Sequence, residues 1–318
     1  YERALYQAQV GRGVVTIAGE CGIVMRKLFS VAEHIFAIEA TAEQFALLGN
    51  YTPFETTDGE PLFVLHVSDE AYRETDEYTK VFVDSSDDDM PRIEVYAAMG
   101  NWRFDVSRRK KDLICFHLSV DARFSNATLY IKDTDVRFAI DNAAMLLYAF
   151  ATAELKTLEM HASVIVKDGY GQLFLGHSGT GKSTHARLWQ EAYPDAWLLN
   201  DDNPVVRVMS DGEVRVYGSP WSGKTPCYKQ AFAPVRGIVK LSQAPHNEMT
   251  RLRLPEAYAY MLSSSSGLKI VPTMMDSLYN TVVRVITTIP VFGLKCLPDK
   301  DAAILCRETL NTIDMTSL

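Results

Sequence analysis

The nine residues from Gly176 to Thr184 constrain the fold of this chain more than any other feature. They read Gly-His-Ser-Gly-Thr-Gly-Lys-Ser-Thr and match the pattern G-x-x-x-x-G-K-S. In this pattern the glycines let backbone N–H groups turn toward phosphate groups, the lysine adds a positive charge, and the serine hydroxyl can bind Mg²⁺. Such a loop follows a strand and opens a helix, because a helix N-terminus favours anions.

The residues on either side meet both requirements. Gln172–Leu175 is a short apolar run of strand type that ends at the loop. After the loop, Ala186, Leu188 and Trp189 give rough helical periodicity, which stops at Pro194. We therefore expect a loop that binds ATP through Gly176, His177, Ser178, Gly179, Thr180, Gly181, Lys182, Ser183 and Thr184.

An acidic pair follows downstream of the loop. Asp201 and Asp202 come directly after Ala196–Leu199 and Asn200, where an apolar strand is predicted. P-loop enzymes hold their metal with carboxylates at such a strand end. Two adjacent acids can divide the work, one at the Mg²⁺ ion and the other accepting the proton of an acceptor hydroxyl. The sequence leaves open which aspartate takes which role.

The chain of 318 residues is long enough for two domains. Residues 1–137 are β-rich, and several of their apolar runs alternate with polar residues, as half-buried strands do. The strands predicted there are Ile35–Glu39, Leu62–His66, Lys80–Val83, Ile93–Ala97, Trp102–Val106, Leu113–Val120 and Ala127–Ile131.

Residues 138–318 form the second predicted domain, an α/β P-loop domain that opens with a long apolar helix over Phe138–Leu155. Asp211-Gly212 is a hairpin signal between two of its strands. The strands predicted here are His161–Val166, Gln172–Leu175, Ala196–Leu199, Val205–Met209, Glu213–Tyr217, Val235–Leu241 and Val291–Cys296. Besides the helix after the loop, helices are predicted at Pro255–Leu262, Met275–Thr287 and Asp301–Asn311.

Charge and composition restrict the partners. A net charge of −8, from 32 basic and 40 acidic residues, argues against a general nucleic-acid-binding surface. The best membrane-spanning candidate, Asn142–Thr152, is too short and lies between Asp141 and Glu154. The five cysteines are scattered without a C-x-x-C pair, which favours a reducing compartment. We therefore expect a cytoplasmic protein with no nucleic-acid or membrane partner.

Three stretches of the second half occur in a fixed order: Met160-His161-Ala162-Ser163-Val164, Leu173–Thr184 and Asn200-Asp201-Asp202. Over roughly residues 158–204 this series resembles the nucleotide core of two related families, ATP-dependent phosphoenolpyruvate carboxykinase and HPr kinase/phosphorylase. The carboxykinases have a His-x-Ser strand, a Gly-x-Ser-Gly-Thr-Gly-Lys-Thr loop and a Gly-Asp-Asp. The HPr kinases have a similar His, Gly-x-Ser-Gly-x-Gly-Lys-Ser and Asp-Asp series.

The resemblance implies a fold of the HPr-kinase/carboxykinase type with ATP and Mg²⁺ at the loop. It implies that Lys182 and Ser183 handle phosphates and Mg²⁺. It also places Asp201, Asp202 and His161 at the metal and the transferred phosphoryl group. The carboxykinases use the corresponding histidine for a second, transition metal, so Mn²⁺ is implied as an alternative. We accordingly expect Lys182, Asp201, Asp202 and His161 to be catalytic, and Ser183, Asp201, Asp202 and His161 to be metal ligands.

The chain also departs from both families. Thr184 stands where HPr kinases have a glutamate, and their Glu-x-Arg-Gly signature has no counterpart here. The chain is also shorter than an ATP-dependent carboxykinase. The favoured function is an ATP- and Mg²⁺-dependent kinase that phosphorylates a hydroxyl of a protein or a small molecule. The alternatives are carboxykinase-like chemistry on a small keto acid and nucleotide sensing without turnover.

The phosphoryl acceptor and the oligomeric state remain open at this point. HPr kinases are oligomeric, so the resemblance allows a homo-oligomer without indicating its surfaces. A second loop, Gly218–Thr225, gathers small residues, Trp221 and Lys224 after a predicted strand. It is either the lining of an acceptor pocket, with Lys224 at a phosphate, or a structural loop packed beneath Trp221.

Overall fold

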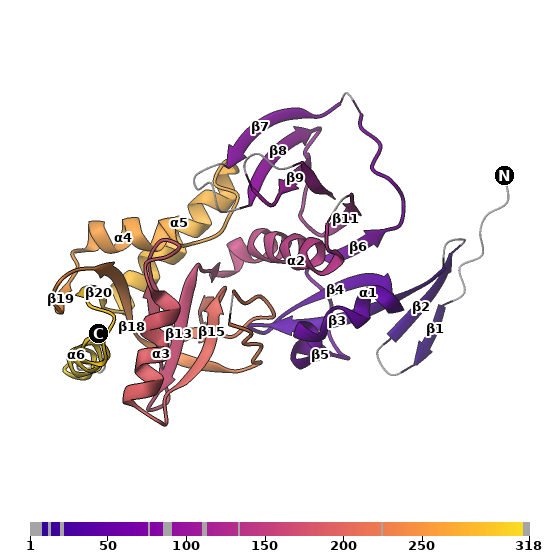
Figure 1. Ribbon diagram of the computed structural model, residues 1–318. Coiled ribbons are helices and arrows are strands. Elements are labelled where there is room, and N and C mark those ends of the chain that lie inside the picture. Colours follow the sequence, from indigo (N-terminus) through magenta and orange to yellow (C-terminus); the bar gives the residue numbers. More distant parts are fainter. Residues whose placement is uncertain are drawn as a thin grey trace, which may run out of the picture. The chain divides into compact units, whose positions relative to one another are not determined.

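The computed structural model describes residues 8–11, 14–19, 22–75, 77–84, 91–109, 113–132, 134–223 and 225–313. The chain divides into two compact units, Tyr1–Ala151 and Thr152–Leu318 (Figure 1). Each unit is built on one large mixed sheet, and helices accompany both sheets. The α/β class expected from the sequence is therefore confirmed.

The first unit contains an eleven-stranded sheet with the order β1-β2-β3-β4-β6-β11-β10-β9-β8-β7, in which β5 pairs with β3. Every strand predicted between Ile35 and Ile131 is present. The strands are β1 (Ala8–Gly11), β2 (Val14–Gly19), β3 (Gly22–Val31), β4 (His34–Thr41), β5 (Glu55–Thr56), β6 (Val64–Ser68), β7 (Thr79–Asp84), β8 (Arg92–Ala98), β9 (Asn101–Ser107), β10 (Ile114–Val120) and β11 (Asn126–Ile131). A short helix α1 (Ala42–Ala46) and a 3-10 helix η1 (Gly49–Phe54) follow β4.

The sequence did not indicate the hairpin of β3 and β4. Its two strands pair antiparallel, with Val31 opposite His34. The two turn residues between them are Ala32 and Glu33, with φ of 48° and 64°. Neither is the glycine, asparagine or aspartate that usually marks such a turn, so no hairpin signal is visible there.

Helix α2 (Val136–Thr152) packs within the first unit. The Tyr148 hydroxyl donates a hydrogen bond to the carbonyl oxygen of Val31 over 3.0 Å, and the ring of Phe150 lies against that of Phe104. The unit therefore ends after Ala151, whereas the sequence prediction began the second domain at residue 138. An apolar helix does not reveal from its sequence which sheet its faces will meet.

The same helix corrects the expectation about membrane-spanning segments. Together with the 3-10 helix η2 (Ala153–Leu155), it forms a 20-residue stretch, Val136–Leu155, that is long and apolar enough to cross a membrane by length and composition. The prediction considered only Asn142–Thr152, but the helix begins earlier. Of its most apolar 18-residue window, 56% is buried inside the protein.

The second unit contains a nine-stranded sheet with the order β12-β16-β17-β18-β14-β13-β15, extended by β20 beside β18 and by β19 beside β20. Its strands are β12 (Thr157–Glu159), β13 (Ala162–Lys167), β14 (Tyr170–Leu175), β15 (Trp197–Asp202), β16 (Val205–Val208), β17 (Val214–Tyr217), β18 (Phe232–Gln243), β19 (Glu248–Arg251) and β20 (Val291–Cys296). Its α-helices are α3 (Lys182–Ala192), α4 (Leu254–Ser263), α5 (Pro272–Thr288) and α6 (Lys300–Asn311). The strands and helices predicted in this half are confirmed, including the hairpin of β16 and β17.

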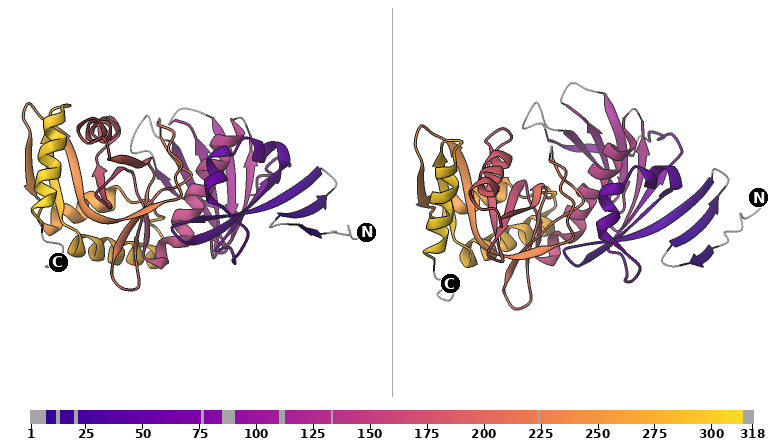
Figure 2. Two further views of the ribbon diagram at one scale, coloured as in Figure 1. Left: turned by 90° about the horizontal axis from the view of Figure 1, so that it is seen from below. Right: turned by 60° about the horizontal axis from the view of Figure 1, so that its bottom comes forward.

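Helices cover both faces of this sheet (Figures 1 and 2). Side chains of α4 and α5 share one buried cluster with Ala162, Leu173 and Leu175. Side chains of α3 and α6 share another with Phe174 and Ile165. Successive residues of β14 therefore enter opposite cores, because side chains alternate along a strand. Strand β14 is parallel to β18 and antiparallel to β13. Its carboxyl end, at Leu175, leads directly into the loop that begins at Gly176.

Candidate functional site

The loop after β14 has the backbone that its glycines allow. Gly181 has φ of 106° and directly precedes α3, and Gly179 has φ of 78°. A β-carbon built at either glycine would meet no other atom within 4 Å. The loop thus offers open space at the N-terminus of an eleven-residue helix, which is the environment that a phosphate group requires.

Lys182 begins α3 and points back across the loop. Its Nζ donates a hydrogen bond to the carbonyl oxygen of Gly176 over 2.9 Å and lies 2.7 Å from Nε2 of His161. An ammonium group has no lone pair to offer, so Nε2 of His161 is the acceptor. The neutral imidazole then carries its proton on Nδ1.

That proton faces the second aspartate. Nδ1 of His161 lies 3.4 Å from Oδ1 of Asp202. Lys182, His161 and Asp202 therefore form a continuous polar chain. The sequence predicted all three as catalytic residues, and the structure brings them together.

The first aspartate has different partners. Oδ1 of Asp201 accepts hydrogen bonds from the hydroxyls of Ser183, over 3.0 Å, and of Ser163. Asp201 is 3% exposed, and Ser163 is fully buried opposite it in the β13–β15 pair. Two hydroxyls on one carboxylate oxygen fix the orientation of the carboxylate and leave Oδ2 available. Ser183 of the loop and Asp201 are thus in direct contact.

Burial shifts the ionisation of three groups in the site. It lowers the pKa of Lys182, although the negative charges of Asp202 and Asp201 oppose this shift. It also lowers the pKa of His161, although the negative charge of Asp202 opposes this shift. It raises the pKa of Asp202, against the charges of His161 and Lys182. Each shift favours the neutral form of its group, and that property suits residues that exchange protons.

A segment from the second predicted loop holds the backbone of the aspartate pair. The carbonyl oxygen of Asp201 accepts hydrogen bonds from the backbone N–H of Gly223, over 2.7 Å, and from the Ser222 hydroxyl, over 3.0 Å. Asp202 has φ of 113°, a conformation that residues other than glycine rarely adopt. Such backbone strain gathers at functional sites, where the surrounding structure maintains it. Lys224 lies outside the described residues, so its predicted phosphate contact stays a prediction.

Gly223 is positioned to control the Asp202 side chain. A β-carbon at Gly223 would lie 3.0 Å from Cβ and 3.2 Å from Oδ2 of Asp202. We expect Gly223→Ala to displace this carboxylate and lower any phosphoryl-transfer rate by roughly ten- to a hundredfold, because catalytic groups tolerate little misplacement. The affinity for ATP should stay within about twofold of the wild type, since Gly223 contacts Asp201 and Asp202 and is not part of the loop Gly176–Ser183. Calorimetry and a transfer assay measure the two quantities.

The matched control is Gly49→Ala in the first unit, where an added β-carbon meets nothing within 4 Å. Equal losses of ATP affinity and transfer rate in Gly223→Ala would contradict a specific effect on Asp202.

A buried acid lies near this site without being part of the polar chain. Glu159 is 1% exposed, and within the described part of the chain neither of its carboxyl oxygens accepts a well-formed hydrogen bond. Burial raises its pKa to about 7; the Ser266 hydroxyl opposes this shift, and the charge of Asp202 adds to it. The folded protein therefore binds this proton more tightly than the unfolded chain does.

The stability of the second unit should consequently fall as the pH rises. Between the unfolded pKa of 4.5 and the folded pKa of about 7, only the folded state keeps the proton. The contribution is fully present below pH 4.5 and is lost as the pH passes through about 7. We expect a loss of roughly 3 kcal/mol between pH 4.5 and pH 8 that is absent in Glu159→Gln. Denaturant unfolding at both pH values, with the exposed Glu308→Gln as control, measures it. An unchanged pH dependence in Glu159→Gln would contradict the assignment.

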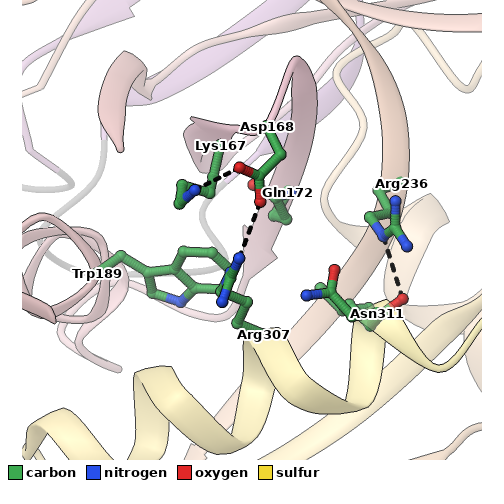
Figure 3. Close-up of a pocket in the computed structure, with 8 residues that line it drawn as sticks. Lys167, Asp168, Gln172, Trp189, Arg236, Arg307 and Asn311 are labelled. Carbon is green, nitrogen blue, oxygen red and sulfur yellow. Dashed lines mark hydrogen bonds and ion pairs between the residues drawn. The ribbon is translucent and has the colours of Figure 1, made fainter. Parts of the chain in front are cut away.

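A separate pocket lies at the opposite end of β13 and β14 (Figure 3). The charged groups that line it are already engaged. Asp168 pairs with Lys167 and with Arg307, and Nε of Arg236 donates to the carbonyl oxygen of Leu310. Because these cations already have partners and lie at the amino end of β14, we assign the pocket no part in the candidate site.

The predicted metal ligands form two pairs. Ser183 contacts Asp201, and His161 contacts Asp202. Within the described ranges, no group of three or more His, Cys, Asp or Glu side chains is arranged to hold a metal ion. The first pair suits Mg²⁺, which takes oxygen ligands and binds through one or two carboxylates while keeping several waters.

Two contributors to the site were not assigned a role from the sequence. Ser163 was visible only as part of a His-x-Ser stretch, and Ser222 only as one small residue of a loop. Their partner is the same aspartate, Asp201, on a strand far away in the sequence. The His-x-Ser spacing could have suggested Ser163, because residues two apart on a strand share a face.

No protein-family model matches this chain, and no curated protein matches it significantly.

Proposed function

We propose that this protein is an ATP- and Mg²⁺-dependent phosphotransferase that moves the γ-phosphoryl group of ATP to a hydroxyl. The observation that carries the proposal is the 3.0 Å hydrogen bond from the Ser183 hydroxyl to Asp201. A serine that follows a loop lysine and meets a strand-end carboxylate is the oxygen pair with which P-loop enzymes hold Mg²⁺.

The loop Gly176–Thr184 would hold the triphosphate. In the proposal Lys182 exchanges its contact with His161 for one with the phosphates and neutralises the charge that develops during transfer. Ser183 and Asp201 would bind Mg²⁺, which bridges phosphate oxygens and offsets their charge. Asp202 is then the residue free to accept the proton of the acceptor hydroxyl, and His161 orients it. This division of roles between the aspartates rests on their different partners.

The acceptor is a hydroxyl of a protein or of a small molecule. The scattered cysteines favour a reducing compartment, so we place the reaction in the cytoplasm. The same site with Mn²⁺ in place of Mg²⁺ remains within the proposal, since both cations accept oxygen ligands.

The test uses γ-labelled ATP. The purified protein is incubated with Mg²⁺, labelled ATP and a lysate of the source cells, and macromolecules are then separated from small molecules. We expect label in one fraction, which identifies a protein kinase or a metabolite kinase. Release of CO₂ from oxaloacetate would indicate carboxykinase-like chemistry instead. Binding of ATP with no label transferred would indicate nucleotide sensing, and either result would overturn the proposal.

A further inference from the structure

A second lysine, Lys240 on β18, lies opposite Leu175, the last residue before the loop. Its Nζ stands 5.1 Å from the ring centre of Tyr260 on α4. Among the described residues no carboxylate forms an ion pair with it. Two other lysines on strands of this sheet do form ion pairs: Lys167 with Asp168, and Lys295 with Glu248. An ammonium group that lies over an aromatic ring, and that pairs with no carboxylate of the described residues, retains most of its capacity to bind an anion.

The strand register puts Lys240 in one row with Asp202. Asp202 pairs with Ala162, Ala162 with Leu175, and Leu175 with Lys240. Residues paired in this way share a face of the sheet, which here is the face covered by α4 and α5. Three strand spacings separate the two charged residues, so their Cα atoms lie roughly 14 Å apart. Gly176, the first residue of the loop, follows the Leu175 between them.

A chain of contacts links Lys240 to His161 along this face. Tyr260 lies beside Lys240. The carbonyl oxygen of Tyr260 accepts a hydrogen bond from the backbone N–H of Ser264. The carbonyl oxygen of Ser264 in turn accepts one from the backbone N–H of His161, over 2.7 Å. Lys240 therefore lies on the face of the sheet that also carries Asp202, and these contacts connect it to His161. Ligands of sheets with parallel strands bind outside the carboxyl ends of those strands.

We propose that Lys240 is a second anion-binding residue of this site, which binds a phosphate or carboxylate group of the ligand on the side away from Asp202. This inference rests on the proposed function. If the anionic group belongs to the acceptor, the acceptor carries a negative charge some distance from the hydroxyl that is phosphorylated. If it belongs to ATP, Lys240 supplements Lys182 at the triphosphate.

Lys240→Gln distinguishes these two sources. Calorimetry measures the affinity for Mg·ATP and for inorganic pyrophosphate, and the labelled-ATP assay with lysate measures transfer. If Lys240 binds the acceptor, we expect transfer at limiting acceptor concentration to fall at least tenfold in Lys240→Gln. The affinity for ATP should then stay within twofold of the wild type. A tenfold loss of ATP and pyrophosphate affinity identifies the nucleotide as its ligand. Lys240→Arg should restore most of the lost function, because it keeps the charge.

Lys295→Gln is the matched control, since it removes one positive charge from the neighbouring strand β20 at a residue paired with Glu248. Thermal unfolding verifies that each variant is folded. If Lys240→Gln leaves transfer, ATP affinity and pyrophosphate affinity all within twofold of the wild type, the inference is wrong. If the wild type transfers no label, the proposed function fails. Lys240 is then tested by ATP and pyrophosphate affinity alone: a tenfold loss supports it, and no change overturns it.

Discussion

Lys182→Ala should lower the rate of phosphoryl transfer by about a hundred- to a thousandfold, because a preorganised charge that stabilises the transition state is worth this much. The folded state should be little affected or slightly more stable. Burial lowers the pKa of Lys182, so the charged side chain is held in the folded protein at some cost. The rate is measured with γ-labelled ATP, and stability is measured by thermal unfolding.

The control for charge is Lys300→Ala on α6, whose side chain is 55% exposed. It should transfer label at the wild-type rate. Normal transfer by Lys182→Ala would rule out the loop as the phosphate site.

Asp202→Asn should lower transfer by about a hundredfold or more, because an amide cannot accept the acceptor proton. It should also change the pH profile. In the wild type the rate should fall as Asp202 becomes protonated. Because burial raises the pKa of Asp202, this fall should occur at a higher pH than for an ordinary aspartate. The residual activity of Asp202→Asn should show no such acid limb.

The comparison variant is Asp195→Asn, just before the other end of β15, where an exposed carboxylate pairs with Lys167. It should retain both the rate and the pH profile. If instead Asp201→Asn removes the acid limb and Asp202→Asn keeps it, the roles of the two aspartates are the reverse of those proposed.

Local patterns were sufficient to predict most elements of the second unit. The apolar run Leu173–Leu175, the glycines after it and the periodicity of α3 all act within a few residues, so the sequence alone places β14, the loop and α3 in the observed order. The membership of α2 could not be predicted in this way. It depends on Tyr148 and Phe150 meeting side chains and backbone of the first unit, and those contacts span long stretches of sequence.

The candidate site likewise combines residues that short motifs reveal with residues that they do not. Lys182, Ser183 and the two aspartates were visible because each lies in a short motif. Ser163 and Lys240 were not assigned a role, because a serine or a lysine on a strand usually faces solvent. Their relevance comes from register: Ser163 lies opposite Asp201, and Lys240 lies opposite Leu175. The resemblance to the kinase and carboxykinase families remains a prediction.

Because the loop comes directly after β14, the residues expected to resist thermal unfolding and the residues expected to bind the ligand are neighbours in the sequence but distinct. Strand β14 is paired on both sides, and Leu173 and Phe174 are fully buried, so its amides should be among the slowest of the unit to exchange hydrogen with water. Only a few residues later, the chain around Gly179 has open space on its side-chain side. If the loop binds the nucleotide proposed above, it can adapt to this ligand without loosening the strand that anchors it. Substitutions in the loop and in the strand should accordingly be selected for different properties, the former for affinity and the latter for resistance to heat.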